Sequence, residues 1–299
     1  MSSSATLRQR WVKEGEILDT RGVLFKPENS SQKVLGLLWD PLQDQLTYQM
    51  KSLTSIISEG KNTKRSVLKG VARIFDPLGL ISPVIIVVKC LFQEIWEQNL
   101  NWDDELPLGL ARRWNGWCQD LIALQDLAVS RRYDQGTGEV VERQLHVFCD
   151  ASTKAYGCVI YLRTVRRDST SVCLVVSKNR VAPLKRLTLP RLELMSNLLG
   201  ARLVTYVKRS SIFQECSVRV WTDSTVALRW IQSQSQLWKL FVANRVADIH
   251  SLVDLKCWGH CPGHENPADL LTRGESIKKL KGNTLWWHGP EWLMEEETC

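Results

Sequence analysis

The spacing of apolar residues changes along this chain of 299 residues. Between residues 63 and 124, apolar side chains recur every three or four positions, as Val67, Val71 and Ile74 do, which is the spacing of amphipathic helices. From residue 145 onward, short runs rich in β-branched and aromatic residues alternate with helical patterns. The pattern therefore predicts a helical region followed by a mixed α/β region.

In the first region the turn signal Asp76-Pro77-Leu78-Gly79 separates two helical patterns, and Pro83 suits the first turn of the second helix. The mostly polar segment 131–143, with Gly136 and Gly138, is interpreted as a linker. The elements expected here are a short helix around 7–11, strands at 33–39 and 46–50, and helices from 63, from 83 to 99 and from 108 to 124.

In the second region three β-rich runs separated by turns predict a three-stranded meander, and helices then alternate with further strands. This order is typical of a mixed sheet covered by helices. The long helix from Thr188 has an apolar stripe formed by Leu192, Met195, Leu199, Leu203 and Tyr206. The expected elements are strands 145–150, 156–163 and 171–177, helix 188–209, strand 218–221, helices 224–232 and 241–252, strand 255–260 and helix 267–272.

Composition is that of a globular protein, with 44% apolar and 24% charged residues. No apolar run is long enough to span a membrane, and the first residues lack the apolar core of a secretory signal. An intracellular protein, cytoplasmic or nuclear, without a membrane partner is therefore expected. The nine cysteines are an odd number without a paired framework, which favours reduced thiols.

Cys257, His260, Cys261 and His264 form the tightest group of metal-ligating residue types. A structural zinc site is one interpretation, although the two cysteines, like the two histidines, are only four positions apart, which is cramped for tetrahedral coordination. The alternative is a strand followed by a loop.

The net charge of +7 is unevenly spread, since residues 144–275 contain 18 Lys and Arg against 10 Asp and Glu. A basic excess of this kind favours a polyanionic partner such as nucleic acid. A solvated basic surface without a partner is the alternative.

Four acidic residues stand in otherwise apolar or basic runs: Asp150, Glu193, Asp223 and Asp269. Asp150 and Asp223 follow predicted strands, so they would meet at one edge if those strands are neighbours, and Glu193 and Asp269 would approach from helices. Because gathered carboxylates repel unless a cation is present, the pattern indicates a site for two hard divalent ions, Mg²⁺ or Mn²⁺. Taken singly, these residues could instead stabilise helix N-termini or begin turns.

Five segments of the second region are distinctive: FCDASTKAYGCVIYLR (148–163), KNRVAPLKRLTLPRLEL (178–194), VWTDSTVALRWI (220–231), FVANRVADI (241–249) and PGHENPADLLTRG (262–274). They resemble the ribonuclease H domain of BEL/Pao long-terminal-repeat retrotransposons. Upstream, KVLGLLWD (33–40), TKRSVLKGVARIFDPLGLISPV (63–84) and WDDELP (102–107) look like the end of the polymerase palm and the thumb or connection of the same polyprotein. Downstream, WWHGPEWL (286–293) is similar to the segment that follows in that family.

The resemblance implies an α/β fold with a ribonuclease H-like mixed five-stranded sheet and flanking helices, preceded by a mainly helical thumb or connection remnant. The implied divisions are a palm-like end at 1–60, thumb or connection and linker at 61–143, ribonuclease H at 144–275 and a C-terminal extension at 276–299. The implied partners are an RNA–DNA hybrid and the polymerase portion of a retroelement polyprotein.

Carried over position by position, the family's metal-binding residues fall on Asp150, Glu193, Asp223 and Asp269, which would hold two Mg²⁺ ions while the RNA strand is cut to leave a 3′-hydroxyl. His264 stands where related enzymes carry a mobile histidine that assists product release, although the loop here is shorter. An exposed loop histidine is the alternative.

Residues expected to contact nucleic acid fall into two groups. A basic group near the carboxylates would hold the backbone: Lys154, Lys178, Arg180, Lys185 and Arg186. Ala151, Ser152 and Asn197 would sense a 2′-hydroxyl, and Asn197 lies one helical turn after Glu193. An Asn tolerated on a half-exposed helix face is the alternative for Asn197.

Two activities are not expected. The only Asp-Asp pair, Asp103-Asp104, lacks the strand context of a polymerase active site, and no Asp-Thr/Ser-Gly motif supports the aspartic peptidase activity under which this family is also known. The competing hypothesis is a non-catalytic nucleic-acid-binding remnant that keeps the fold.

Overall fold

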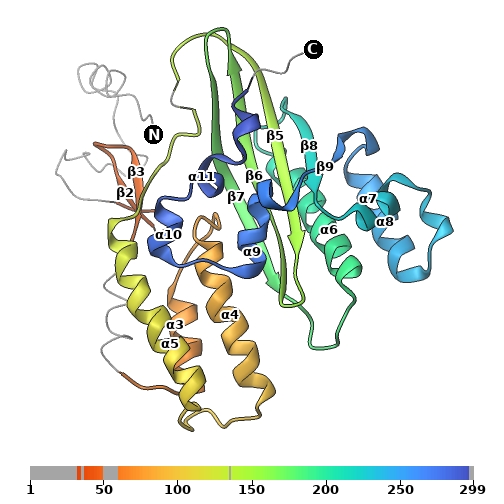
Figure 1. Cartoon of the computed structure of the whole chain (residues 1–299). Helices are drawn as coiled ribbons and strands as arrows, with labels where there is room; N and C mark the ends of the chain where they lie inside the picture. The colour runs from red at the N-terminus through yellow and green to blue at the C-terminus, as the bar shows by residue number, and fades with distance from the viewer. Residues whose placement is uncertain (1–31, 35–36, 50–59, 135, 296–299) are drawn as a thin grey trace, which may run out of the picture.

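The computed structural model describes residues 32–34, 37–49, 60–134 and 136–295. The helix expected around 7–11 lies outside these residues. Figure 1 shows a twisted central sheet with helices on both faces and a helical bundle at one side. Two sheets are present in the described residues, a five-stranded sheet and a small four-stranded sheet.

The central sheet has the strand order β7-β6-β5-β8-β9. Neighbours β5 and β6, and β6 and β7, are antiparallel, whereas β8 runs parallel to both β5 and β9. This confirms the predicted mixed sheet, with Asp150 and Asp223 on adjacent strands. The strands are β5 (Val140–Ala151), β6 (Ala155–Arg166), β7 (Thr170–Val181), β8 (Ser217–Thr222) and β9 (Trp258–His260).

Several boundaries differ from the prediction, among them the strand expected at 33–39, which forms two antiparallel strands, and two in the central sheet. Strand β5 begins at Val140, inside the expected linker, because residues 140–143 pair with β6 at a part of the hairpin where side chains remain exposed and polar residues are tolerated. The expected strand 255–260 is shorter, since Asp254 caps a 3-10 turn, η3 (Leu255–Cys257), through the Lys256 N–H.

One face of the sheet is covered by α6 (Leu189–Val207), α7 (Thr225–Gln232) and α8 (Leu240–Leu252). Gly200 of α6 allows close approach to β5, since a Cβ there would lie 2.5 Å from the Cys149 sulfur. Helix α6 is buried on more than the predicted stripe because α8 packs on its outer side. The predicted apolar stripe is wrong at Tyr206, which is 67% exposed.

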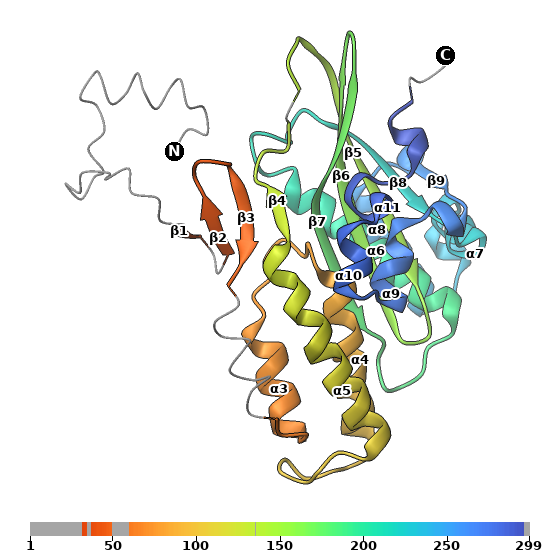
Figure 2. The ribbon, with the colours of Figure 1, turned by 60° about the vertical axis from the view of Figure 1, so that its left-hand side comes forward.

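The opposite face packs against α4 (Ser82–Glu97) and the short C-terminal helices α9 (Leu270–Arg273), α10 (Ile277–Lys281) and α11 (Thr284–His288). Figure 2 shows α3 (Lys64–Arg73), α4 and α5 (Leu108–Asp120) side by side below this face. Apolar side chains of α4 and α5 therefore share one core with Phe148, Val159 and Tyr161 of the sheet.

A half-buried carboxylate joins α4 to the small sheet. Asp76 accepts hydrogen bonds from the Leu80 and Ile81 N–H groups at the start of α4, and from the Tyr48 hydroxyl at 2.9 Å. Burial raises the pKa of Asp76. The small sheet has the order β1 (Gln32–Val34), β2 (Leu37–Asp40), β3 (Gln45–Tyr48) and β4 (Ala128–Ser130), and β4 was not predicted.

The C-terminal segment is tied to the middle of the sheet. The Tyr161 hydroxyl donates to the Trp286 carbonyl at 2.7 Å, and Arg163 Nε donates to the Leu293 carbonyl at 2.8 Å. Trp286 is fully buried and donates from its indole to the Leu80 carbonyl beside α4. Residues 276–295 thus complete the core between the sheet and the N-terminal helices.

Within the part of the chain that the structure describes, no helix combines the length and apolar character required to cross a membrane.

Candidate active site

Four carboxylates from four separate elements lie at one end of the central sheet. Asp150 is at the end of β5, and Asp223 follows β8 directly. Glu193 lies in the first turn of α6, which begins at Leu189-Pro190, and Asp269 ends the 3-10 turn η5 (Pro267–Asp269) before α9. The carboxyl ends of β5 and β8 meet at one edge because these strands are parallel.

Asp150 is buried, with 6% of its surface exposed. Its Oδ2 accepts a hydrogen bond of 2.6 Å from the Thr272 hydroxyl. Burial, together with the negative charges of Asp223 and Asp269, raises the pKa of Asp150 to about 6. This carboxylate therefore takes up positive charge readily, as a proton or a cation.

Glu193 is held by the residue that caps the next helix. The Ser224 hydroxyl donates to Glu193 Oε2 and accepts from the Ala227 N–H at the start of α7. Burial and the charge of Asp150 raise the pKa of Glu193. Ser224 was not predicted as a site residue, because its sequence signal is that of an ordinary helix cap.

Asp223 has a buried oxygen, Oδ1, to which no group in the described protein donates a hydrogen bond. Burial raises its pKa, and the charges of Glu193 and Asp269 add to that rise. The loop after β9 lies against this carboxylate, since a Cβ at Gly263 would come within 3.3 Å of Oδ2.

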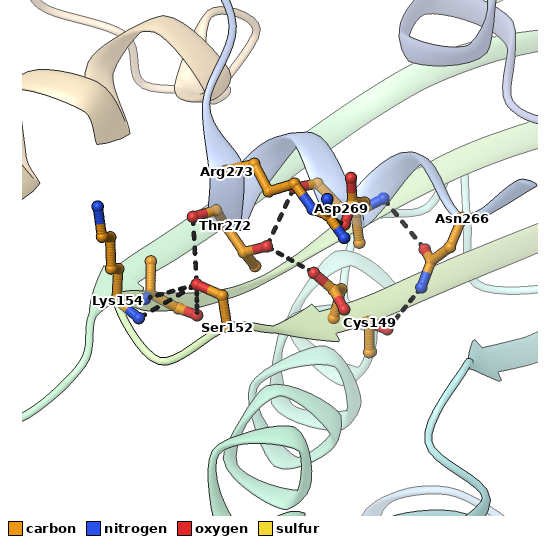
Figure 3. Close-up of polar contacts among 10 residues, drawn as sticks. Cys149, Ser152, Lys154, Asn266, Asp269, Thr272 and Arg273 are labelled. Carbon is orange, nitrogen blue, oxygen red and sulfur yellow. Dashed lines mark hydrogen bonds and ion pairs between the residues drawn. The ribbon is translucent and has the colours of Figure 1, made fainter. Parts of the chain in front are cut away.

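Asp269 is more exposed than Asp150 and forms an ion pair with Arg273, one helical turn later, at 2.7 Å. The Arg273 side chain is 75% exposed, so this pair lies at the surface of the site. Figure 3 shows Arg273 and Asp269 on the same short helical segment above the end of β5.

The donor set fits hard divalent ions, which prefer carboxylate oxygens. The unpartnered Asp223 Oδ1 and the mutual effects on the pKa values of Asp150, Glu193 and Asp223 indicate a site that lacks compensating positive charge. As the side chains stand, no three Asp, Glu, His or Cys groups of the described residues converge as a metal site. Glu193 and Asp269 are directed to Ser224 and Arg273, so rotation of these two side chains would be needed.

The family described as the Pao retrotransposon-like RNaseH-like domain matches residues 63–224, which is more than half of the chain and contains Asp150, Glu193 and Asp223. The chain belongs to this family. The resemblance to Pao-type elements drawn from the sequence is thereby confirmed. A search of curated proteins found no match.

Solved ribonucleases H are similar to part of this Pao retrotransposon-like chain. The N-terminal RNase H domain of a Mycobacterium tuberculosis protein, solved as a fusion with maltose-binding protein, has 15% identity and a TM-score of 0.29, covering 46% of this chain and 96% of that one. RNase H1 from Halobacterium salinarum has 14% identity and a TM-score of 0.28, covering 46% and 98%. A foamy viral protease-reverse transcriptase in complex with dsDNA has 13% identity and a TM-score of 0.27, covering 77% and 44%.

His264 of this Pao-family chain lies in the 3-10 turn η4 (Gly263–Glu265) and is exposed. Its Nε2 lies 3.4 Å from Glu265 Oε1. The neighbouring Gly263 approaches Asp223, so His264 stands at the rim of the carboxylate group.

The basic residues predicted to contact nucleic acid are all exposed: Lys154, Lys178, Arg180, Lys185 and Arg186. Lys154 lies in the turn between β5 and β6, directly after the strand that carries Asp150. Lys178 and Arg180 alternate along β7 with Ser177 and Asn179, which bond to the start of α4, so the two basic side chains project from the other face.

The three residues predicted to sense a 2′-hydroxyl are less exposed than these basic residues. Ala151 is buried at the end of β5, and the Ser152 hydroxyl accepts from the Ala155 N–H and lies 3.3 Å from the Thr272 carbonyl. Asn197 is fully buried, and neither amide atom has a hydrogen-bond partner, so the expected contact with nucleic acid is wrong for this arrangement. The reason is that α6 is enclosed between the sheet and α8.

Cys257, His260, Cys261 and His264 do not converge as a metal site in this structure. Cys261 is buried beside the end of β8, where its N–H donates to the Thr222 carbonyl, and its thiol is free. The geometry favours the strand followed by a loop over structural zinc.

Two further residues at the site, Asn266 and Thr272, were not singled out in the sequence. Both are buried and bond to the end of β5. Asn266 had a recognisable signal as a cap before Pro267, whereas nothing local indicates that Thr272 contacts a residue 122 positions away.

Proposed function

We propose that this chain is a ribonuclease H-type endonuclease that hydrolyses the RNA strand of RNA–DNA hybrids with two Mg²⁺ or Mn²⁺ ions. The observation that carries the proposal is the meeting of Asp150, Glu193, Asp223 and Asp269 at one sheet edge, where the charge of each affects at least one other. Membership of the Pao family supports it.

Asp150, Glu193, Asp223 and Asp269 are the residues that would hold the ions. When bound, a pair of such ions activates the attacking water and stabilises the leaving oxygen of a phosphodiester. In the net reaction a water oxygen bonds to phosphorus, the bond from phosphorus to the 3′-oxygen breaks, and that oxygen takes up a proton as a 3′-hydroxyl.

The protein's own contribution is to hold the backbone positions that carry the four carboxylates at one end of the sheet before substrate arrives. Asp150 is the most enclosed of the four, and the Thr272 hydroxyl fixes the carboxylate that would hold the ions. Glu193 is oriented by Ser224, which belongs to the same turn as Asp223. His264, exposed at the rim, would assist release of the product.

The substrate backbone would be held by Lys154, Lys178, Arg180, Lys185 and Arg186, with the exposed backbone near Ser152 facing the cleaved strand. Contacts of this type to phosphate depend on charge rather than base sequence. The polymerase portion of a retroelement polyprotein is the proposed protein partner, because the first segments resemble the end of a polymerase palm and its thumb or connection.

The test is cleavage of a hybrid labelled on its RNA strand by the purified chain, with Mg²⁺ and with EDTA. We expect Mg²⁺-dependent cleavage that Asp223→Asn abolishes without loss of folding. Asp248→Asn is the matched control, since Asp248 is an exposed acid on α8 that pairs with Arg202. Binding of hybrid without cleavage by the unaltered chain would favour the non-catalytic remnant.

A further inference from the structure

The segment that carries Asp269 is attached to both strand ends that precede the other aspartates. The Cys261 N–H donates to the Thr222 carbonyl, directly before Asp223, at 3.1 Å. The Asn266 side chain donates from Nδ2 to the Cys149 carbonyl, directly before Asp150, at 3.0 Å. The loop after β9 is therefore connected to the backbone on either side of the carboxylate group.

Asn266 uses both ends of its amide. Oδ1 accepts from the Ala268 N–H and so caps the turn that ends at Asp269, while Nδ2 makes the contact to Cys149. An amide side chain can accept at its oxygen and donate from its nitrogen at the same time, and Asn266 is 1% exposed. A serine would keep an acceptor for the cap but would be too short to reach the strand.

Thr272 makes the corresponding contacts on the other side of Asp269. Its hydroxyl lies 2.6 Å from Asp150 Oδ2 and 3.0 Å from the Asp269 carbonyl, and its own carbonyl lies 3.3 Å from the Ser152 hydroxyl. Figure 3 shows this set of contacts between the helical segment and the end of β5. Thr272 is 3% exposed, so water does not replace these bonds.

We infer that Asn266 and Thr272 are positioning residues that clamp the backbone of Asp269 against the end of β5, so that rotation of its side chain away from Arg273 brings its carboxylate to the cation site. They stand three residues before and three residues after Asp269, and each bonds to a different part of residues 149–152. This inference rests on the proposed function, because it assigns the purpose of the clamp to ion binding. Residues that orient metal ligands in this manner commonly change metal affinity by 10- to 100-fold when they are replaced.

The test measures Mg²⁺ affinity by calorimetry on the full chain, with cleavage kinetics alongside. We expect Thr272→Val and Asn266→Ser to weaken Mg²⁺ binding by about 10-fold or more and to lower kcat, with little change in KM for the hybrid. Thr272→Ser keeps the hydroxyl and should restore both quantities.

Two control variants separate clamping from stability. Thr205→Val removes a hydroxyl that donates to the Ala201 carbonyl within α6, and Asn283→Ser changes a cap that accepts from the Trp286 N–H. Both should leave Mg²⁺ affinity unchanged. If Thr272→Val fails to fold, the Asn266→Ser and Thr272→Ser variants still decide the question.

Failure of the clamp and failure of the proposed function give different results. An unaltered chain that cleaves, with Asn266→Ser and Thr272→Val binding Mg²⁺ equally well, would overturn the clamp alone. An unaltered chain that binds Mg²⁺ but cleaves nothing would overturn the proposed function, and the affinities of the variants would still decide the clamp. A chain that binds no Mg²⁺ would overturn both.

Discussion

Asp150 and Asp223 occupy equivalent positions on two neighbouring parallel strands. Cys149 of β5 pairs with Thr222 of β8 at the end of the ladder, so each aspartate is the next residue along its strand. The two carboxylates are thus brought to one end of the sheet by backbone pairing. Burial is the main cause of the raised pKa of each, and the charge of Asp223 adds to the rise at Asp150.

We expect Asp150→Asn to stabilise the metal-free chain at neutral pH. The pKa of Asp150 is about 6 in the folded protein against an ordinary value of 3.8, so its charge is unfavourable throughout the range above pH 6. As pH falls from 6 to 3.8, the folded state binds a proton that the unfolded state does not, and the cost disappears. Removing the negative charge with Asp150→Asn should raise the free energy of unfolding by up to about 3 kcal/mol above pH 6.

The measurement for Asp150→Asn is thermal unfolding in EDTA between pH 4 and pH 8. The gain over the unaltered chain should shrink as the pH falls below 6. Asparagine can still accept from Thr272, so a loss of stability of equal size at every pH would contradict this account.

Arg273→Ala should strengthen Mg²⁺ binding a few-fold, because an ion competes with the guanidinium for Asp269. The pair is exposed, so folding stability should change by less than about 1 kcal/mol. Lys279→Ala is the control, since Lys279 forms an i,i+4 pair with Glu275 on the neighbouring short helix. Calorimetric titration with Mg²⁺ decides the matter, and weaker binding by Arg273→Ala would show that the arginine supports the site.

Arg180→Ala should weaken hybrid binding and make it less sensitive to salt. Each phosphate contact that is lost lowers the slope of log K against log salt by about 0.7 to 0.9. Arg167→Ala is matched in residue type and exposure, but it lies at the opposite end of the β6–β7 hairpin. Fluorescence anisotropy at several salt concentrations measures the slope, and equal slopes for both variants would remove Arg180 from the interface.

Acid should destabilise the chain partly through His146. Its Nδ1 accepts from the Trp221 indole at 3.1 Å, so the proton is on Nε2, which faces Gln144. Burial and the charges of Arg163 and Arg219 lower the pKa of His146 to about 3.

Between pH 6.5 and about 3 the unfolded chain therefore binds a proton at this residue that the folded chain does not, and stability falls with falling pH by up to about 1.4 kcal/mol per unit. His146→Gln should be less stable at pH 7 but should lose less stability on acidification. Urea unfolding at pH 7, 5.5 and 4.5 tests this, and parallel losses for both proteins would count against it.

The sheet and the placement of Asp150 and Asp223 could be predicted because both depend on local signals: β-rich runs, turns, and a carboxylate directly after a strand. The start of β5 could not, since Val140 and Val141 adjoin a mostly polar segment with two glycines, and residues 140–143 form a strand through pairing with β6. The burial of Asn197 and the reach of Thr272 to Asp150 are likewise set by packing between distant segments. Local spacing carries no information on such contacts.

The attachment of Tyr161 and Arg163 to residues 286 and 293 has a practical consequence for anyone who wishes to express a minimal ribonuclease H unit. A fragment that keeps only the central sheet and the helices α6, α7 and α8 would expose Phe148, Val159 and Tyr161 to water. These side chains are covered by the N-terminal helices and by residues 277–293. We expect such a fragment to aggregate. The sheet is the middle layer of three, and both the α6, α7 and α8 layer and the layer of N-terminal helices and C-terminal residues must be present to cover it.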